Sequence, residues 1–546
     1  FERIVDAVVP HRDLSRHPLF QVFFNMVNLP PLHLEMPALT VEEIFVDGQD
    51  AKFDLTLYVH GSGDALWLQS HYDADLFSSA QITELLAQYL TLLQALVEAP
   101  SRPLDESSLL TDSARTLLPD PTQPLDETWR GPVHAHFDRQ VERDPQHLAV
   151  SDRHVRWSYL ELQSRSRRLA AQLRANGVGK GDVIAIYAAR RAEIACALLA
   201  SFRLGAAFVM LDPTYPAQRT RHYLDIARPK VWLQLGDGIE AGLVEELGES
   251  FEAIDQRLDL ETIEAICADV SAPMLDIDDA GLEPADLAYL AFTSGSTGLP
   301  KAVEGCHSSL THFLPWLQER FGYGAHSRFS LLSGLAHDPL HRDVFTPLMI
   351  GATLCVPEQE DFAPQRLQRW MLEQGFKVSH LTPSVSRILC DTDADARLLE
   401  LSCAFLTGEL LTTHDMRQVA RVAPNTLIVN FYGSTETQRA VSHPVISARE
   451  LPAQGAAGHG KAHIPLGRGI PGVQLVLLNG KGLQAGIGEA AEIFIRSPHL
   501  ARGYWQDSEL TAERFLRNAF TDCASDMLYR TGDLGRYCPD GQVEAL

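Results

Sequence analysis

Short apolar runs alternate with amphipathic segments along most of the chain after residue 129. Residues 182–187 and 207–211 are almost continuously apolar, as in buried strands, and residues 191–204 between them repeat apolar positions at helical spacing. Gly205 stands where this helix would end. The pattern predicts strand, helix and strand in succession, and such units form largely parallel sheets with helices packed on them.

The pattern changes in two later regions. Residues 236–284 are acidic and less regular, which predicts a peripheral excursion from the sheet. Residues 465–546 have short strands separated by turns, with Asn479-Gly480 and Asp540-Gly541 as hairpin signals. We therefore expect a β-rich subdomain near the end.

The first hundred residues have a pattern of their own. Residues 53–59 resemble a strand, and Ser78 or Ser79 can cap a helix near the end of this region. The apolar residues of that helix fall on one face, which we predict to be core: Ile82, Leu85, Leu86, Tyr89, Leu90, Leu93 and Leu96. Little periodicity follows in residues 100–128, which contain Pro100, Pro103, Pro119, Pro121 and Pro124 and predict a linker. The predicted division is therefore 1–99, 100–128 and 129–546.

Composition narrows the possible functions. A chain of 546 residues exceeds what one core usually supports, so two or more domains are expected. The net charge of −25 argues against nucleic-acid binding, which needs clustered lysine and arginine. Eight scattered cysteines show neither a Cys-x-x-Cys pair nor Cys/His ligand spacing, which suits a reducing compartment and argues against structural zinc. We expect these cysteines to be buried.

Targeting signals are not visible in the sequence. The first residues lack the basic start and apolar core of a signal peptide, and no apolar run is long enough to cross a bilayer. The prediction is a cytoplasmic protein without a membrane partner. The chain starts with Phe1 instead of Met and stops in an apparent strand at residues 543–546, so we expect a fragment of a longer protein.

Residues 287–303, LAYLAFTSGSTGLPKAV, carry the most specific chemistry. An apolar run ends in a loop of Thr, Ser and Gly, where glycines allow close backbone approach to phosphate and Lys301 supplies a neutralising charge. The spacing of Gly295, Gly298 and Lys301 differs from the GxxxxGK[ST] loop of P-loop ATPases. The loop predicts polyphosphate binding by another kind of enzyme. The alternative is an ordinary Gly/Ser turn.

Three further segments follow in order and strengthen this reading. Residues 430–438, NFYGSTETQ, offer an aromatic ring, two threonine hydroxyls and Glu436 as a hard oxygen ligand for Mg²⁺. Residues 501–505 read ARGYW, and residues 529–537 read YRTGDLGRY, where Asp533 is a carboxylate suited to a ribose diol. Each segment alone is more often a turn or a cap, but the occurrence of four such segments in this order argues against coincidence.

Together these segments resemble the adenylation domains of non-ribosomal peptide synthetases, members of the adenylate-forming superfamily, from about Trp129 to the end. The resemblance implies an α/β fold: a large adenylate-forming core with parallel-rich sheets and a β-rich subdomain, preceded by a partial α/β condensation-type domain. After residue 546 the family continues into a small lid subdomain with a lysine that aids adenylation. Without this lid, we expect binding of ATP with feeble turnover.

The resemblance assigns nucleotide contacts residue by residue. It implies that the loop from Thr293 to Lys301 grips the β- and γ-phosphates, that Thr435 contacts the α-phosphate and that Glu436 binds Mg²⁺. Asn430 and Tyr432 would flank adenine, and Asp533 would bind the ribose. The remaining implied nucleotide contacts are Ser294, Gly295, Ser296, Thr297, Gly298, Gly408, Glu409, Phe431, Gly433 and Ser434.

The implied reaction is attack of a substrate carboxylate on the α-phosphorus of ATP, which forms an acyl adenylate and releases pyrophosphate. In the family, the phosphopantetheine thiol of a separate carrier domain then displaces AMP. The start of the chain resembles the end of a condensation domain, through RDLSRHPLFQVFFN at residues 12–25, with His17 where Asn is usual, and KFDLTL at residues 52–57. The HHxxxDG motif is absent from the chain, so this part should dock and not form peptide bonds.

The substrate pocket of the family is lined at set offsets from the motifs. Those offsets give Asp338, Pro339, Arg342, His380, Phe405, Thr407, Phe431, Arg439 and Ala440. Asp338 matches the family's ligand for the substrate α-ammonium. Two arginines in a pocket either pair with Asp343 or Glu436, or await an acidic substrate.

Residues 333–348 and 431–441 look particularly like the α-aminoadipate reductases. We therefore predict an amino-dicarboxylic substrate, aminoadipate or glutamate-like, held by Arg342 or Arg439. His337 stands at a position where the family often has an aromatic gate beside the reacting carboxylate, with simple packing as the alternative. His134, His307 and His312 are read as packing or capping residues.

Two other functions remain open. An acyl-CoA or aryl-acid ligase uses the same ATP machinery, but its substrate has no ammonium for Asp338. A non-catalytic docking fragment is the second alternative, because the lid is missing. The absence of GxSxG and of a dinucleotide fingerprint disfavours hydrolase and reductase chemistry within these residues.

Overall fold

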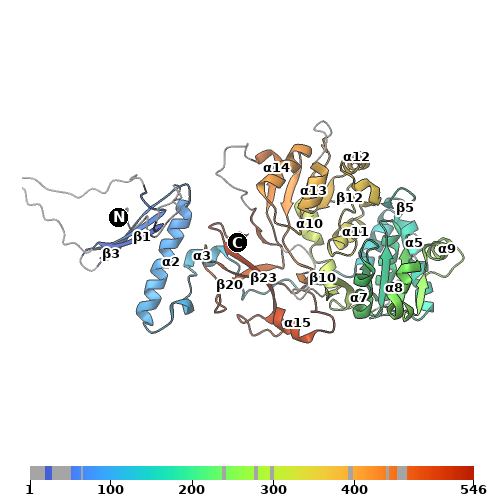
Figure 1. The fold of residues 1–546 in the computed structure, drawn as a ribbon, viewed down its shortest axis with the longest axis horizontal. Coiled ribbons are helices and arrows are strands. Elements are labelled where there is room, and N and C mark those ends of the chain that lie inside the picture. Colours follow the sequence, from blue (N-terminus) through green and yellow to red (C-terminus); the bar gives the residue numbers. More distant parts are fainter. Residues whose placement is uncertain are drawn as a thin grey trace, which may run out of the picture. The chain divides into compact units, whose positions relative to one another are not determined.

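The computed structural model describes residues 19–27, 51–62, 65–236, 241–275, 281–294, 300–390, 397–437, 442–451 and 464–546 (Figure 1). The chain divides into two compact units. Unit 1 comprises Phe1–Leu118, Asn479–Ala490 and Arg536–Gly541, and unit 2 comprises Pro119–Leu478, Ala491–Gly535 and Gln542–Leu546.

Unit 1 contains a three-stranded sheet and one long helix. The sheet has the order β1-β2-β3, with β1 and β2 parallel and β2 and β3 antiparallel: β1 (Val22–Val27), β2 (Leu55–Ser62) and β3 (Ala65–Tyr72). The helix α2 (Ser79–Glu98) begins after Ser78, whose side chain accepts from the backbone N–H of Gln81 in a capping box. The predicted cap at Ser78 is therefore confirmed.

The predicted core face of α2 is only partly buried. Ile82 is buried, but Leu85, Leu90 and Leu93 are exposed, so the prediction is wrong for these three leucines. The apolar period fixes which residues share a face of a helix, whereas burial depends on what packs against that face. The family motif at residues 12–18 lies outside the described residues.

The predicted linker, residues 100–128, is not free of structure. It contains the 3₁₀ turn η1 (Leu104–Glu106) and the short helix α3 (Asp112–Leu117). The hydroxyls of Thr111 and Ser113 both donate to the carboxylate of Glu84 in α2, at 2.6 and 3.0 Å. These polar contacts tie the segment to α2, and local periodicity could not reveal them.

Unit 2 contains a six-stranded sheet in the order β11-β10-β7-β6-β8-β9. All neighbouring strands are parallel except β10 and β11, which are antiparallel. The strands are β6 (Val183–Ala188), β7 (Ala207–Leu211), β8 (Val231–Leu235), β9 (Gln256–Leu258), β10 (Leu287–Ser294) and β11 (Pro300–Cys306). The helices of this part are α5 (Tyr159–Ala175), α6 (Glu193–Leu204), α7 (Ala217–Ala227), α8 (Ala241–Glu252) and α9 (Leu260–Ala268).

The predicted strand, helix and strand are confirmed as β6, α6 and β7. Gly205 ends α6 in the left-handed conformation, with φ of 67°, as a helix-terminating glycine does. The acidic stretch at residues 236–284 is more than an excursion, because β9 continues the sheet beside β8.

A second sheet of unit 2 has eight strands in the order β18-β16-β15-β14-β12-β13-β4-β5. Its strands are β4 (Leu148–Ser151), β5 (Arg156–Ser158), β12 (Arg328–Ser330), β13 (Thr353–Cys355), β14 (Val378–Leu381), β15 (Cys403–Leu406), β16 (Leu427–Asn430) and β18 (Val445–Ser447). The central strands are parallel, and the edge strands β5 and β18 are antiparallel.

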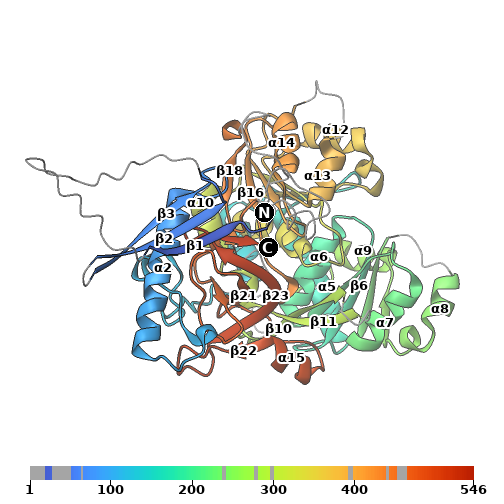
Figure 2. The same ribbon diagram turned by 60° about the vertical axis from the view of Figure 1, so that its left-hand side comes forward.

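The helices that accompany this sheet are α4 (Val133–Arg143), α10 (Leu314–Phe321), α11 (Pro339–Ile350), α12 (Pro364–Gln374), α13 (Pro383–Cys390) and α14 (Thr413–Val422), with 3₁₀ turns η2 (Ser308–Leu310) and η3 (Gln359–Phe362). Figure 2 shows α12, α13 and α14 grouped together, apart from α7 and α8 of the first sheet.

The end of the chain forms a third, antiparallel sheet, in agreement with the predicted β-rich region. Its strands are β20 (Gln474–Leu478), β21 (Ala491–Arg496), β22 (Phe515–Arg517), β23 (Met527–Tyr537) and β24 (Val543–Ala545), and the helix α15 (Ser508–Arg514) precedes β22. A small pair is formed by β17 (Ser442–His443) and β19 (Arg468–Gly469). The turns η4 (Thr435–Thr437) and η5 (Ala448–Glu450) complete the elements.

Several smaller predictions can be compared with the structure. Six cysteines are buried as expected, but Cys523 is exposed and Cys538 is half-buried. His307 is buried against the ring of Phe202, with 5.1 Å between ring centroids, which is the packing role expected of it. Among the described residues, no helix is long and apolar enough to cross a membrane.

Candidate functional site

The predicted phosphate loop joins the two antiparallel strands β10 and β11. Thr293 pairs with Lys301 and Ser294 pairs with Pro300, so both strands lead directly into the loop. Gly295, Ser296, Thr297 and Gly298 lie outside the described residues. A hairpin connection differs from the strand-to-helix connection of P-loop ATPases, in keeping with the different spacing of the motif.

The second motif begins where β16 ends. Asn430 is the last residue of β16, and its side-chain amide donates to the carbonyl of Pro465 at 3.1 Å. The backbone N–H of Phe431 donates to the carbonyl of Leu406 at 2.7 Å, which continues the pairing with the neighbouring strand. These bonds fix the backbone from which Tyr432, Gly433 and Ser434 follow.

Tyr432 and Asp533 are brought together although they are 101 residues apart in the chain. The hydroxyl of Tyr432 donates to Oδ2 of Asp533 at 2.6 Å. Burial and the nearby Asp533 carboxylate raise the pKa of Tyr432 well above its ordinary value, so the hydroxyl stays protonated and remains a donor. The two residues predicted to contact adenine and ribose thus lie side by side.

Thr435 and Asp338 are also in direct contact. The hydroxyl of Thr435 donates to Oδ1 of Asp338 at 2.9 Å. Thr435 opens the turn η4, and Asp338 directly precedes α11. The residue predicted to contact the α-phosphate therefore touches the residue predicted to bind the substrate ammonium, as a reaction between the two substrates requires.

Glu436 is the predicted magnesium ligand, and it is 7% exposed. The hydroxyl of Tyr504 donates to its Oε1 at 2.7 Å. The described residues contain no cluster of three or more His, Cys, Asp or Glu side chains able to hold a metal ion alone. One carboxylate fits Mg²⁺, which is usually bound through one or two carboxylates, waters and substrate phosphates.

The predicted substrate residues gather at the carboxyl ends of neighbouring parallel strands. His380 in β14 pairs in register with Phe405 in β15, and Phe405 pairs with Val429 in β16. The rings of Phe405 and Phe431 stack with centroids 4.7 Å apart. Ligands of open α/β sheets bind at this edge of the sheet. Thr407, directly after β15, is buried as well.

Arg342 of α11 is buried in this cluster at 6% exposure, with its guanidinium carbon 5.6 Å from the ring centroid of Phe431. Its guanidinium makes no hydrogen bond or ion pair with any described residue. Burial lowers the pKa of Arg342, and only the nearby charges of Asp338 and Asp343 oppose that effect. Arg342 therefore presents a desolvated positive charge without a direct partner in the described part of the chain.

Asp343 does not take the role of that partner. Its Oδ1 accepts from Nδ1 of His380 at 2.8 Å, and its Oδ2 accepts from the backbone N–H groups of Leu332 and Ser333 at 3.1 and 2.9 Å. The alternative in which Arg342 pairs with Asp343 is not the arrangement observed. Arg439 and Ala440 lie outside the described residues, and Pro339 is the first residue of α11.

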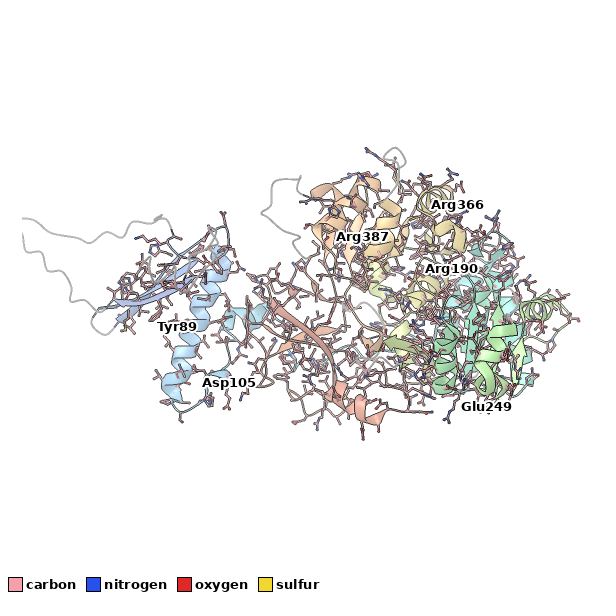
Figure 3. All side chains as sticks on the ribbon, viewed as in Figure 1. Tyr89, Asp105, Arg190, Glu249, Arg366 and Arg387 are labelled. Carbon is pink, nitrogen blue, oxygen red and sulfur yellow. The ribbon has the colours of Figure 1, made fainter. Side chains whose placement is uncertain are left out.

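Other predicted residues are less closely connected. Nε2 of His337 lies 3.1 Å from the hydroxyl of Tyr215, and His337 itself is exposed. Gly408 has a φ of 87°, which favours glycine. Glu409 is exposed and pairs with Nη1 of Arg387, one of the arginines labelled in Figure 3, at 3.8 Å. This contact holds Glu409 to α13 and not to the other predicted residues.

The sequence analysis missed contributors that come from other segments. Tyr504 lies in the ARGYW motif, which was noted without a role for its tyrosine. Arg190, labelled in Figure 3, donates to the carbonyls of Leu331 and Ser333 at 2.9 and 2.8 Å. It steadies the segment that leads to Asp338. No motif surrounds Arg190, so only the contact reveals it.

The chain matches two family models. A model described as "AMP-binding enzyme" matches residues 137–505, and one described as "Condensation domain" matches residues 1–118. The first match covers more than half of the chain. The chain belongs to the AMP-binding enzyme family. The prediction of an adenylation domain preceded by part of a condensation domain is confirmed, and so is the fold class.

Relatives of this AMP-binding enzyme include larger proteins. The L-2-aminoadipate reductase large subunit of Penicillium chrysogenum is 35% identical, over 90% of this chain and 38% of that protein. Tyrocidine synthase 3 of Brevibacillus parabrevis is 31% identical, over 100% of this chain and 8% of that protein. The chain therefore spans less than half the length of these relatives.

A solved structure shares the fold over the whole chain. The four-domain nonribosomal peptide synthetase holo-AB3403, solved with AMP and glycine bound, aligns with a TM-score of 0.82 and 25% identity. The alignment covers 100% of this chain and 40% of that protein.

Proposed function

We propose that this AMP-binding enzyme activates an amino acid with ATP. A carboxylate oxygen of the amino acid attacks the α-phosphorus, the bond from that phosphorus to the β-phosphate bridging oxygen breaks, and aminoacyl adenylate and pyrophosphate result. The contact between Thr435 and Asp338 supports this proposal, because it joins the predicted phosphate and ammonium subsites. Holding two reactants in the correct geometry supplies much of the rate of such a step.

On the nucleotide side, Lys301 neutralises phosphate charge, and Tyr432 and Asp533 bind the nucleoside. Magnesium bound at Glu436 would neutralise phosphate oxygens and stabilise the departing pyrophosphate. The roles of Thr293, Ser294, Gly408, Glu409, Asn430, Phe431, Gly433 and Ser434 in nucleotide binding belong to the same proposal, as does that of the loop residues Gly295, Ser296, Thr297 and Gly298.

On the amino-acid side, we propose an amino-dicarboxylic substrate, aminoadipate or glutamate-like. The observation that carries this choice is Arg342, which is buried without a hydrogen-bonded or ion-paired partner among the described residues. A buried guanidinium without a counter-ion is costly, and a substrate carboxylate would remove that cost. Asp338 accepts the α-ammonium, and the name of the aminoadipate reductase relatives favours the same substrate class.

His380 forms part of the wall of the proposed substrate pocket. The hydrogen bond from its Nδ1 to Asp343 holds the ring in place. Phe405, Thr407 and Phe431 supply the remaining wall. His337 is exposed and lies beside Tyr215, and this position suits the proposed role of a gate over the reacting carboxylate.

The further setting is also proposed. It comprises a division into 1–99, 100–128 and 129–546, a carrier domain whose phosphopantetheine thiol takes the aminoacyl group, and a cytoplasmic location. The condensation-domain match, residues 1–118, extends into the proposed linker. Free cysteines suit a reducing compartment. Of the rival functions, an acyl-CoA or aryl-acid ligase would leave Asp338 without an ammonium to bind.

The test is pyrophosphate release combined with calorimetry on residues 1–546. Aminoadipate, glutamate, glutamine, leucine and benzoate would be compared in the presence of ATP and Mg²⁺. We expect binding and slow pyrophosphate release with the acidic amino acids, and neither binding nor release with leucine or benzoate. A preference for leucine would contradict the acidic substrate, and a preference for benzoate would contradict amino-acid activation altogether.

A further inference from the structure

The short segment Ala501–Trp505 connects the two chemical elements of the nucleotide site. The backbone N–H of Ala501 donates to the carbonyl of Glu436 at 2.9 Å. The same segment pairs with β11, where Arg502 and Trp505 donate to the carbonyls of Glu304 and Ala302 at 3.0 and 2.8 Å. It therefore joins the turn that carries Glu436 to the strand that carries Lys301.

Tyr504 extends this connection to the side chains themselves. It is 7% exposed, its hydroxyl donates to Oε1 of Glu436 at 2.7 Å, and Nζ of Lys301 lies 5.9 Å from its ring centroid. One side chain thus contacts both the predicted metal ligand and the predicted phosphate-binding lysine.

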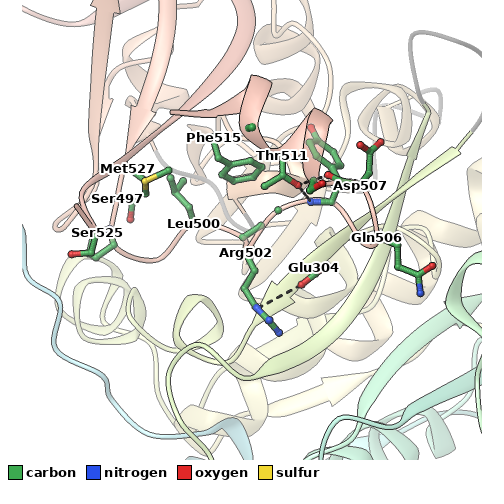
Figure 4. Close-up of a pocket in the computed structure, with 16 residues that line it drawn as sticks. Glu304, Ser497, Leu500, Arg502, Gln506, Asp507, Thr511, Phe515, Ser525 and Met527 are labelled. Atoms are coloured by element: carbon green, nitrogen blue, oxygen red, sulfur yellow. Dashed lines mark hydrogen bonds and ion pairs between the residues drawn. The ribbon is translucent and has the colours of Figure 1, made fainter. Parts of the chain in front are cut away.

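The backbone around Tyr504 is held closely. Its N–H donates to Oγ1 of Thr511 at 2.9 Å. Gly503 has a φ of 145°, and a Cβ there would meet the Thr511 side chain at 2.5 Å, so only glycine fits. Beyond this point a cavity of 720 Å³ is bounded by residues that include Leu500, Thr511 and Phe515, with the Arg502–Glu304 ion pair at its side (Figure 4). None of the residues predicted to bind nucleotide or amino acid lines that cavity.

We propose that Tyr504 is a positioning residue that orients Glu436 for Mg²⁺ and keeps Lys301 aligned with the polyphosphate. The inference rests on the proposed function, because it presupposes that Glu436 binds Mg²⁺ carried by ATP. A hydrogen bond to one carboxylate oxygen restricts rotation of the carboxylate and directs the other oxygen. Partners that orient a metal ligand in this way typically contribute about 10- to 100-fold to metal affinity.

The test uses Tyr504→Phe, which keeps the ring and removes the hydroxyl. ATP binding to residues 1–546 would be measured by calorimetry with and without Mg²⁺. The ratio of the two affinities should fall about tenfold in Y504F, while binding of ATP without Mg²⁺ stays at the wild-type level. Tyr504→Leu, which also removes the ring beside Lys301, should weaken binding of metal-free ATP in addition.

Tyr159→Phe is the matched control. Tyr159 is also buried, and its hydroxyl donates to the carbonyls of Pro347 and Ala352 at 3.1 and 2.7 Å, neither of which is a predicted site residue. Y159F should lower thermal stability without changing the ratio of the ATP affinities measured with and without Mg²⁺. Glu436→Gln provides the coupling test: Y504F added to E436Q should cause no further loss, because the ligand it orients is already gone.

The outcomes separate the inference from the proposed function. If the wild-type chain binds ATP no better with Mg²⁺ than without it, the proposed magnesium role of Glu436 fails, and the inference fails with it. If the wild type shows the magnesium effect and Y504F retains it fully, only the inference is overturned. Equal losses in Y504F and Y159F, or additive losses in the double variant, would likewise overturn it.

Discussion

Replacing Arg342 by methionine is the most direct test of the carboxylate clamp. Methionine keeps most of the length and apolar contact of the side chain and removes the charge. In the protein alone this charge has no hydrogen-bonded or ion-paired partner among the described residues, and Asp343 is already satisfied by His380 and two backbone N–H groups. Within the described part of the chain, R342M therefore breaks no ion pair or side-chain hydrogen bond, and it should fold at least as stably as the wild type.

The effect on binding should be large and selective. Arg342 is 6% exposed, so a substrate carboxylate placed against it would be desolvated together with it. Truncating one partner of such a pair costs about 2–5 kcal/mol. This corresponds to a loss of roughly 30-fold to several thousandfold in affinity for aminoadipate or glutamate. The affinity for glutamine, which lacks the side-chain charge, should fall much less.

The assay is calorimetric binding of glutamate, aminoadipate and glutamine to wild type and R342M, with pyrophosphate release as a second readout. Arg366→Met serves as control, because Arg366 is an exposed arginine of α12 that forms a long ion pair, 4.0 Å, with the exposed Glu360 (Figure 3). The control should leave all affinities unchanged. Wild-type affinity of R342M for both acidic amino acids would refute the clamp at this residue.

Three further predictions concern the site and the stability of unit 2. Asp338→Asn should lower the affinity for every amino acid by a similar factor while ATP binding persists, as separate calorimetric titrations would show. A selective loss of affinity for the acidic substrates would contradict this prediction. Asp138→Asn should cost about 3–5 kcal/mol at pH 7, because it breaks the buried ion pair with Arg203 at 2.6 Å. Burial alone would raise the pKa of Asp138, but the hydrogen bonds and charge of Arg203 lower it, so this stabilisation exists above the unfolded pKa of about 3.9 and fades as pH falls below it. Urea unfolding at pH 7 and pH 3 should therefore show a smaller difference between wild type and variant at pH 3. Gly503→Ala should destabilise by about 1–3 kcal/mol through its positive φ and the close Thr511 side chain, whereas Gly480→Ala, with open space around it, should be nearly neutral; equal melting temperatures of the two variants would disprove the strain.

Local pattern predicted the parts of the fold that short stretches of chain decide. The strand, helix and strand at β6, α6 and β7 follow from apolar runs and from Gly205, and Ser78 caps α2 as its position suggests. The exposed leucines of α2 and the helix α3 in the predicted linker did not follow. Their state depends on the surfaces packed against them, and a local period carries no information about these surfaces.

The sequence by itself determined which residues are chemically equipped for the site, because phosphate binding needs a glycine-rich loop with a lysine and each motif lies within a few neighbouring residues. The tertiary structure decided which of these residues meet. Tyr432 reaches Asp533 across 101 residues, Thr435 reaches Asp338 across 97, and Tyr504 reaches Glu436 across 68. It also assigned Asp343 to His380 and left Arg342 without a carboxylate partner among the described residues. Such pairings depend on how separate sheets pack: Tyr432 follows β16 of the eight-stranded sheet, whereas Asp533 lies in β23 of the five-stranded sheet. A local sequence pattern carries no information about that packing.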